Sequence, residues 1–280
     1  MLGAIIGDIV GSRFEFAIPD IKSKQFAFYH HKCKPTDDSI MTLAIANAIL
    51  SCGDYGNYSK LAQQAVLYMR DMGRRYPKAG YGGRFRTWLH ESDPKPYGSL
   101  GNGAAMRVSP CAHAAGTLEE AISLSKTVTE VTHNHKEGIK GAEATTVAIY
   151  MALHGSTKDE ICNMIAKEKK YYNLSFTLDQ IRPDYKFDET CQGTVPQAIV
   201  AFLESTGFED AIRNAISIGG DSDTVAAITG SIAEAYYGIP ANIRHQAFTY
   251  LNRMQIDIVD RFEAKYGIVP EKNQEEGVTT

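Results

Sequence analysis

The sequence predicts an all-α fold, and three features lead to that prediction. Apolar residues recur with the helical period along most of the 280 residues. Alternating apolar and polar residues joined by hairpin turns are almost absent, and only the stretch 23–30 resembles a strand. Many of the periodic segments also begin and end with residues that are typical of helix termini.

The first element is a core helix in the segment MLGAIIGDIVGSRFEF. This segment differs from a signal peptide because its start is not basic and Asp8 interrupts its apolar run. Gly3, Gly7 and Gly11 lie on one face of the helix, although glycine costs about 1 kcal/mol of helix stability relative to alanine. We therefore expect another helix backbone to approach this face, and we expect Asp8 to cap or support a neighbouring loop.

The remaining helices follow in chain order. Ser156 or Thr157 can cap one of them, Pro196 suits a first turn, and Gly238 followed by Pro240 ends another. The predicted ranges are 39–50, 60–72, 118–131, 137–153, 157–167, 196–203, 208–218, 224–237 and 243–265.

The chain reads as one domain, 1–280, with a flexible tail at about 268–280, because it has neither a dividing linker nor a fixed repeat. A net charge of −4 gives no electrostatic case for general nucleic-acid binding. The sequence predicts no membrane span, since no stretch approaches the roughly 20 apolar residues required. Five scattered cysteines favour free thiols in a reducing cytoplasm. We also expect the protein to be a monomer.

Acidic residues stand twice at the start of an apolar helix. "PTDDS" carries Asp37 and Asp38, and "GGDSDT" carries Asp221 and Asp223. Each motif alone is explained by helix capping. Capping needs only one oxygen, however, and crowded carboxylates repel one another when they are buried.

A bound divalent cation would remove that repulsion. Carboxylate and hydroxyl oxygens without nearby His or Cys favour Mg²⁺ or Mn²⁺, with Ca²⁺ as an alternative, over zinc. Four aspartates and two threonines suffice for two metals that share carboxylates. Periodicity does not establish that the two helices meet.

The chain resembles the ADP-ribosylglycohydrolase family, which includes the hydrolases that remove ADP-ribose from arginine in proteins. The resemblance lies in "GAIIGDIVGSRFE", "TDDS", "GSLGNGAAMRVSP", "VTHNHKEGIKGAEA" and "GGDSDTVAAITGSIAEAYYG", in that order. It implies a compact all-helical fold with two Mg²⁺ or Mn²⁺ ions in a cleft. The metal ligands implied by the matching motifs are Thr36, Asp37, Asp38, Asp221, Asp223 and Thr224.

The glycine-rich segment GSLGNGAAMR is by itself compatible with an ordinary loop, although glycines let backbone N–H groups approach a phosphate. The resemblance implies that this loop contacts the diphosphate and distal ribose of ADP-ribose, and that His133 lies along the same cleft. Some relatives have tyrosine where Leu100 stands, so one stacking contact is in question. The substrate-binding residues expected on this basis are Gly98, Ser99, Gly101, Asn102, Gly103 and His133.

The predicted reaction is hydrolysis of the glycosidic bond between ADP-ribose and its target, with ADP-ribosyl-arginine in proteins as the first candidate. The resemblance implies catalytic roles for Glu15 and Asp38. Glu15 would either bind the metal-held water or act as general base. Phe14 and Phe16 flank Glu15, so we expect this loop to pack on the protein and direct Glu15 inward.

Other functions stay open at this stage. They are hydrolysis of ADP-ribose O-linked to serine or a metabolite, hydrolysis of ADP-ribosylated nucleic acid, a two-metal phosphohydrolase, and a non-catalytic ADP-ribose-binding or structural protein. All four metal carboxylates are present, which favours an enzyme.

Overall fold

The computed structural model describes residues 1–52 and 57–267, and every regular element within these ranges is a helix. The all-α prediction is therefore confirmed. The described residues contain one isolated β-type bridge, between Gly101 and Thr190, and the stretch 23–30 is an irregular loop. None of the helices in the described ranges is long and apolar enough to cross a bilayer. The predicted flexible tail, 268–280, lies outside the described residues.

The helices vary in length from four to eighteen residues. A 3₁₀ turn covers Asn102–Ala104, and a π-helical turn, Met164–Glu168, continues α8. The α-helices are α1 (Leu2–Gly11), α2 (Asp37–Ser51), α3 (Leu61–Arg75), α4 (Gly83–Trp88), α5 (Ser109–Ala114), α6 (Leu118–Glu130), α7 (Lys136–Leu153), α8 (Lys158–Asn163), α9 (Leu178–Ile181), α10 (Cys191–Leu203), α11 (Phe208–Ile216), α12 (Ser222–Tyr237), α13 (Ala241–Phe248) and α14 (Arg253–Tyr266).

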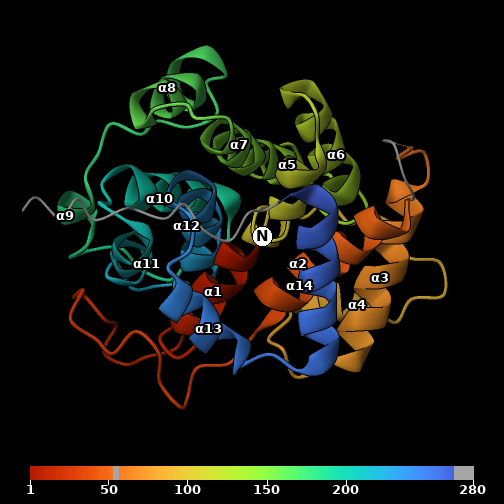
Figure 1. The fold of residues 1–280 in the computed structure, drawn as a ribbon, viewed down its shortest axis with the longest axis horizontal. Helices are drawn as coiled ribbons and strands as arrows, with labels where there is room; N and C mark the ends of the chain where they lie inside the picture. Colours follow the sequence, from red (N-terminus) through yellow and green to blue (C-terminus); the bar gives the residue numbers. More distant parts are fainter. Residues whose placement is uncertain (53–56, 268–280) are drawn as a thin grey trace, which may run out of the picture.

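Helix α1 lies at the centre of the molecule and packs along α12 (Figure 1). All ten of its residues are buried, as expected for a helix that is apolar on every side. A Cβ atom added at Gly3 would lie 2.2 Å from the carbonyl oxygen of Gly230, and one at Gly7 would lie 2.0 Å from that of Ala226. The predicted approach of another helix backbone to the glycine face is confirmed.

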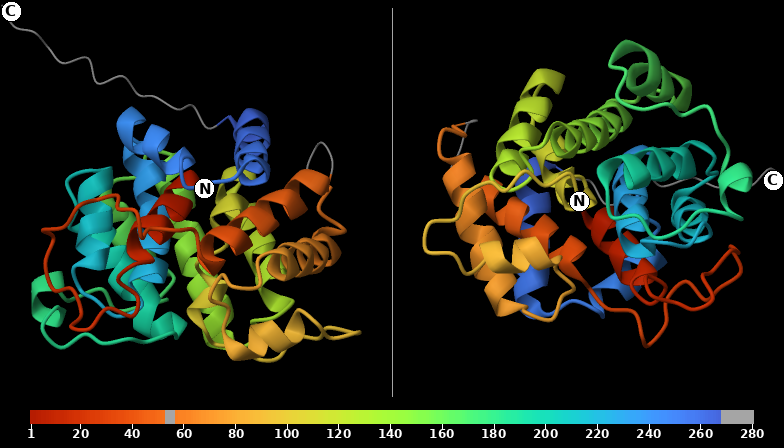
Figure 2. Two further views of the ribbon diagram at one scale, coloured as in Figure 1. Left: turned by 90° about the horizontal axis from the view of Figure 1, so that it is seen from below. Right: turned by 180° about the vertical axis from the view of Figure 1, so that it is seen from behind.

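The other helices surround this central pair. Helix α12 also packs against α7, α10 and α11, while α2 packs against α3, α5 and α14. Figure 2 shows α10, α11 and α12 on one side of α1, and α2 and α3 on the other. The starts of α2 and α12 are thereby directed toward the region between the groups.

Three predicted helix boundaries are wrong, and two of them are helix starts. The range 243–265 is split, because Asn252 starts α14 through a capping box in which it and Gln255 exchange side-chain-to-backbone hydrogen bonds. Pro196 does not lie in a first turn, since α10 begins at Cys191 and the Thr190 side chain caps it by accepting from the Gly193 N–H.

The helix predicted at 157–167 has the expected start and a different end. Thr157 caps it through a capping box with Glu160, as the sequence indicated. Its α-helical part ends at Asn163 and the π-helical turn follows, so the end of the predicted range is not regular α-helix.

We expect Gly7→Ala to destabilise the fold strongly. The new methyl group would overlap backbone atoms of α12 that cannot shift independently of the core, a cost of roughly 1–3 kcal/mol or more. Gly83→Ala is the matched control, because that helical glycine has no heavy atom within 4 Å of an added Cβ. Urea denaturation followed by circular dichroism would compare the two variants, and equal stabilities would contradict the close approach.

Candidate active site

The buried carboxylate of Asp8 holds the start of α2 in place. It accepts hydrogen bonds from the Thr36 N–H at 2.8 Å, the Thr36 hydroxyl at 2.6 Å and the Ser39 N–H at 2.9 Å, and also from the Ser39 hydroxyl. Thr36 is the N-cap residue but its own side chain does not cap the helix. Asp8 therefore performs the capping from a neighbouring helix, in agreement with the supporting role predicted for it.

The start of α12 is shaped by two glycines. Gly219 and Gly220 have φ values of +73° and +69°, a left-handed backbone that glycine adopts without a steric penalty. This turn delivers Asp221 as the N-cap residue and Asp223 in the first turn. A residue with a side chain at position 219 or 220 would strain this turn. The placement of the two aspartates therefore depends on the two glycines.

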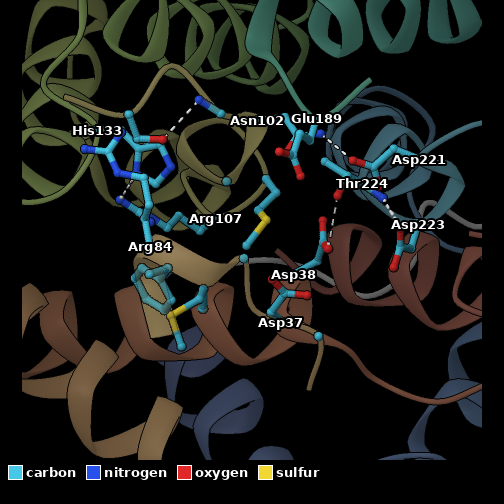
Figure 3. A pocket seen from close by; sticks show the side chains of 18 of the residues that line it. Asp37, Asp38, Arg84, Asn102, Arg107, His133, Glu189, Asp221, Asp223 and Thr224 are labelled. Atoms are coloured by element: carbon cyan, nitrogen blue, oxygen red, sulfur yellow. Dashed lines mark hydrogen bonds between the residues drawn. The ribbon is translucent and has the colours of Figure 1, made fainter. Parts of the chain in front are cut away.

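The starts of α2 and α12 meet, which the sequence left undecided. The Thr224 hydroxyl donates to Asp38 Oδ2 at 3.2 Å (Figure 3), and the Thr36 hydroxyl lies 3.4 Å from Asp223 Oδ2. Two acidic segments about 190 residues apart in the sequence are thereby joined into one cluster.

The cluster is buried, and this changes its acid–base behaviour. Burial raises the pKa of Asp37, Asp38 and Asp223 well above the usual range, and nearby carboxylates raise it further. The pKa of Glu15 rises to about 7 because of burial and the Asp221 charge, although a hydrogen bond with Asp223 opposes the rise. Without a cation, the full negative charge of the cluster is therefore unfavourable.

These residues fit a divalent cation. The described carboxylates form two groups whose oxygen atoms lie within 4.8 Å of one another: Asp8 with Asp38 and Asp223, and Glu15 with Asp221 and Asp223. The oxygen Asp38 Oδ1 is buried, and no group in residues 1–52 and 57–267 donates a hydrogen bond to it. An unpaired buried carboxylate oxygen is costly, and a hard cation such as Mg²⁺ or Mn²⁺ satisfies it.

The cluster forms one end of a pocket of about 440 Å³. Acidic side chains gather at one side of Figure 3, and Arg84, Arg107 and His133 lie at the other. The pocket is lined by Glu15, Phe16, Asp37, Asp38, Met41, Gly80, Gly82, Gly83, Arg84, Phe85, Tyr97, Ser99, Gly101, Asn102, Gly103, Met106, Arg107, His133, Phe187, Glu189, Asp221, Asp223 and Thr224.

The glycine-rich loop lies between the two ends, and four of its five predicted residues line the pocket. Gly98 does not, and its N–H donates to the Asn134 side chain at 2.7 Å. The Asn102 side chain was expected to donate to the ligand, but it donates to Asp221 Oδ2 at 2.6 Å and to the Thr194 hydroxyl at 3.0 Å. Asn102 therefore positions an acidic residue in this structure.

Buried hydrogen bonds from Arg107 through Thr132 hold the side chain of His133 in place. Arg107 Nη2 donates to the Thr132 hydroxyl at 2.7 Å, and that hydroxyl lies 2.7 Å from His133 Nδ1. Burial and Arg107 hold the pKa of His133 well below its usual value, so the ring is neutral. The Thr132 hydroxyl accepts from Arg107 and can donate its own proton to His133 Nδ1. Because Nδ1 is then the acceptor, the ring proton is assigned to Nε2. This atom lies 3.3 Å from the position of a Cβ added at Gly103, so it faces the glycine loop.

Arg107 is a functional candidate that the sequence reading did not single out. Its side chain is buried, and among the described residues no carboxylate forms an ion pair with it. Burial lowers its pKa to about 10, which leaves the guanidinium charged at neutral pH. The available signal was an arginine within the apolar segment "AAMRVSP". Glu189 also lines the pocket, and no motif marks it in the sequence.

The loop that carries Glu15 is only partly as predicted. Phe14 packs on Phe26 with ring centroids 5.0 Å apart, and Glu15 faces the pocket. Phe16, however, is 76% exposed and contacts only the ring of Phe187 among the described aromatic residues, so this side of the loop packs on the protein less than predicted. Thr36, predicted as a metal ligand, lies beneath the pocket lining, bonded to Asp8.

Comparison with known proteins agrees with this arrangement. The family model described as ADP-ribosylglycohydrolase matches residues 1–267. The chain belongs to the ADP-ribosylglycohydrolase family. It is therefore an enzyme of the glycohydrolase class.

Two relatives and one solved structure illustrate the similarity to this family member. It is 29% identical to ADP-ribosylarginine hydrolase Tri1 of Pseudomonas putida (strain GB-1), with 85% of this chain and 70% of that protein covered. It is 27% identical to ADP-ribosylhydrolase ARH3 of Xenopus tropicalis, with 89% and 90% covered. A solved structure named ADP-ribosylglycohydrolase-related protein complex has the same fold, with a TM-score of 0.68, 23% identity and 95% of both chains covered.

The Asp38 carboxylate is expected to have two effects: it destabilises the metal-free protein, and it binds the cation. We expect the substitution Asp38→Asn to separate them. In the presence of a chelator the variant should be at least as stable as the parent protein, because one buried like charge is removed. Added Mn²⁺ should stabilise the parent by about 2.7 kcal/mol at a hundredfold excess over its dissociation constant, and the variant much less. Thermal unfolding with and without Mn²⁺ measures both quantities.

The control is Asp71→Asn, which removes an exposed carboxylate paired with Arg75. Its response to Mn²⁺ should equal that of the parent protein. An undiminished Mn²⁺ effect in Asp38→Asn would exclude Asp38 as a ligand.

Proposed function

We propose that this enzyme hydrolyses the bond between ADP-ribose and the arginine side chain of a modified protein, with two divalent cations, Mg²⁺ or Mn²⁺. The observation that supports this most directly is the two-ended pocket. One end holds buried carboxylates, and the other holds the buried and charged Arg107, which has no carboxylate partner among the described residues. ADP-ribose has matching ends: ribose hydroxyls suited to metal coordination and a dianionic diphosphate.

The metal ions would be held by the oxygen atoms of the two helix starts. The proposed ligands are Thr36, Asp37, Asp38, Asp221, Asp223 and Thr224. Cations bound there would supply Lewis acidity toward ribose oxygens and water. Their positive charge would let the four aspartates ionise, because it offsets both the cost of burial and the repulsion between neighbouring carboxylates.

Glu15 is the proposed general base. Its half-buried carboxylate faces the pocket beside Asp221 and Asp223, where it can accept a proton from a water at the acidic end. It would accept the proton of the water that attacks the anomeric carbon. The transition state would have oxocarbenium character, as in other glycoside hydrolyses.

The diphosphate would lie along the glycine loop. Ser99, Gly101 and Gly103 line the pocket there, and the Nε2–H of His133 is directed at the same loop. Arg107 fixes His133 through Thr132 and adds positive charge close by. These donors would orient ADP-ribose so that its reacting carbon lies at the acidic end.

Arginine is favoured as the leaving group by electrostatics. Glu15 and Glu189 both line the pocket near the acidic cluster, where a cationic guanidinium is attracted. The relative named as an arginine hydrolase points the same way. O-linked ADP-ribose, ADP-ribosylated nucleic acid and binding without turnover remain alternative outcomes of the substrate assay.

We expect turnover to require a divalent cation, because the clustered carboxylates are otherwise uncompensated. Exhaustive chelation should abolish release of product, and Mg²⁺ or Mn²⁺ should restore it. Mass spectrometry of the product distinguishes the reactions, since a glycohydrolase releases intact ADP-ribose and a phosphohydrolase releases AMP. Full activity after exhaustive chelation would contradict the metal site.

We expect Glu15→Gln to fold and to bind ADP-ribose while turnover falls at least about a hundredfold, the usual contribution of a general base. Titration calorimetry and single-turnover kinetics measure the two halves separately. Glu143→Gln is the control, since that carboxylate bonds the Tyr171 hydroxyl away from the pocket. Loss of affinity with intact chemistry would instead make Glu15 a binding residue.

A further inference from the structure

Two large aromatic side chains stand exposed and stacked at the rim of the pocket. Phe16 follows α1, and Phe187 belongs to the loop between α9 and α10. Their ring centroids are 5.9 Å apart with an interplanar angle of 26°, and they are 76% and 46% exposed. Ile18, on the same loop as Phe16, is 98% exposed. This is an apolar surface built from two loops, which we call the aromatic rim.

The aromatic rim is continuous with the acidic end of the pocket. Phe16 directly follows Glu15, and Phe187 lies two residues before Glu189, and all four residues line the pocket. The other exposed large apolar residues of the described chain, Leu67 and Leu153, lie elsewhere and do not line it. The rim is therefore placed where the leaving group must pass when ADP-ribose fills the pocket.

We propose that the aromatic rim binds the polypeptide on either side of the modified residue and favours an apolar side chain close to it. This inference rests on the proposed function, because only a protein-linked substrate brings a polypeptide to the mouth. When the glycosidic bond lies beside Glu15, the chain that carries it crosses Phe16 and Phe187. Apolar contact with exposed aromatic rings is then gained without disturbing the fold.

Two other occupants agree less well with the surface. A second copy of the chain would need roughly 800 Å² of interface from each partner, and two phenylalanines supply far less. A nucleic acid could stack its bases on the rings, but Glu15 and Glu189 beside them repel its phosphates. A polypeptide has neither difficulty.

The test uses three ADP-ribosyl-arginine substrates that differ only outside the pocket. One is a peptide with leucine or phenylalanine next to the modified arginine, another has serine and glycine there, and the third is free ADP-ribosyl-arginine. For the parent enzyme we expect kcat/KM to be highest on the apolar peptide. Phe16→Ser should lower that value about ten- to a hundredfold, the affinity that burial of one aromatic side chain contributes.

The same variant should change kcat/KM on free ADP-ribosyl-arginine by less than about twofold. Phe187→Ser should behave alike, and Leu67→Ser is the control, because it removes an exposed apolar side chain remote from the pocket. All three changes are at the surface, so stability should be nearly unchanged.

Three results would overturn the docking role while parent turnover stays intact. The first is equal loss on all substrates, and the second is no loss on the apolar peptide. The third is a loss confined to an ADP-ribosylated oligonucleotide, which is assayed as an additional substrate. Absence of ADP-ribose release by the parent enzyme from any arginine-linked substrate would instead reject the proposed function, and this inference with it.

Discussion

The contact between the backbones of α1 and α12 is the constraint on which the candidate site depends. A Cβ at Gly11 would lie 2.5 Å from the Cα of Asp223, so the glycine face of α1 sets the position of the acidic start of α12. Asp8 projects from the same helix and holds the start of α2 with four hydrogen bonds. One buried helix therefore fixes both acidic segments, and any widening of its contact with α12 would separate them.

The buried carboxylates at the starts of α2 and α12 lower the stability of the metal-free fold. Three aspartates are buried within reach of one another, and one oxygen of Asp38 has no donor among the described residues. Such a group is tolerated only where the surrounding structure is rigid, because flexible helix starts would move apart and admit water. The fully buried α1 and the mostly buried α12 provide that rigidity. A cation would turn the unfavourable charge into coordination bonds.

Local features of this site were predictable from the sequence, and long-range ones were not. The glycine spacing predicted a helix contact, and the paired aspartates predicted a metal cluster. The Asn102–Asp221 hydrogen bond joins residues that are 119 apart in the sequence. The exposure of Phe16 depends on the neighbouring loop. The periodicity of the sequence gives no information on either feature. The break before α14 was readable in principle, since Asn252 and Gln255 form a capping box signature that was overlooked among apolar residues.

The fold separates the recognition of ADP-ribose from the recognition of its carrier. The groups proposed to hold the metals and ADP-ribose lie on α2, on α12, on the partly buried loop before α5 and, for His133, just before α7. A change on these elements propagates into the core. The aromatic rim belongs to loops whose exposed side chains, Phe16 and Phe187, contribute little to packing. Loops of this kind can vary without cost to the scaffold. Selectivity for the modified partner can therefore change at the rim while the α1–α12 contact and the acidic cluster stay constant.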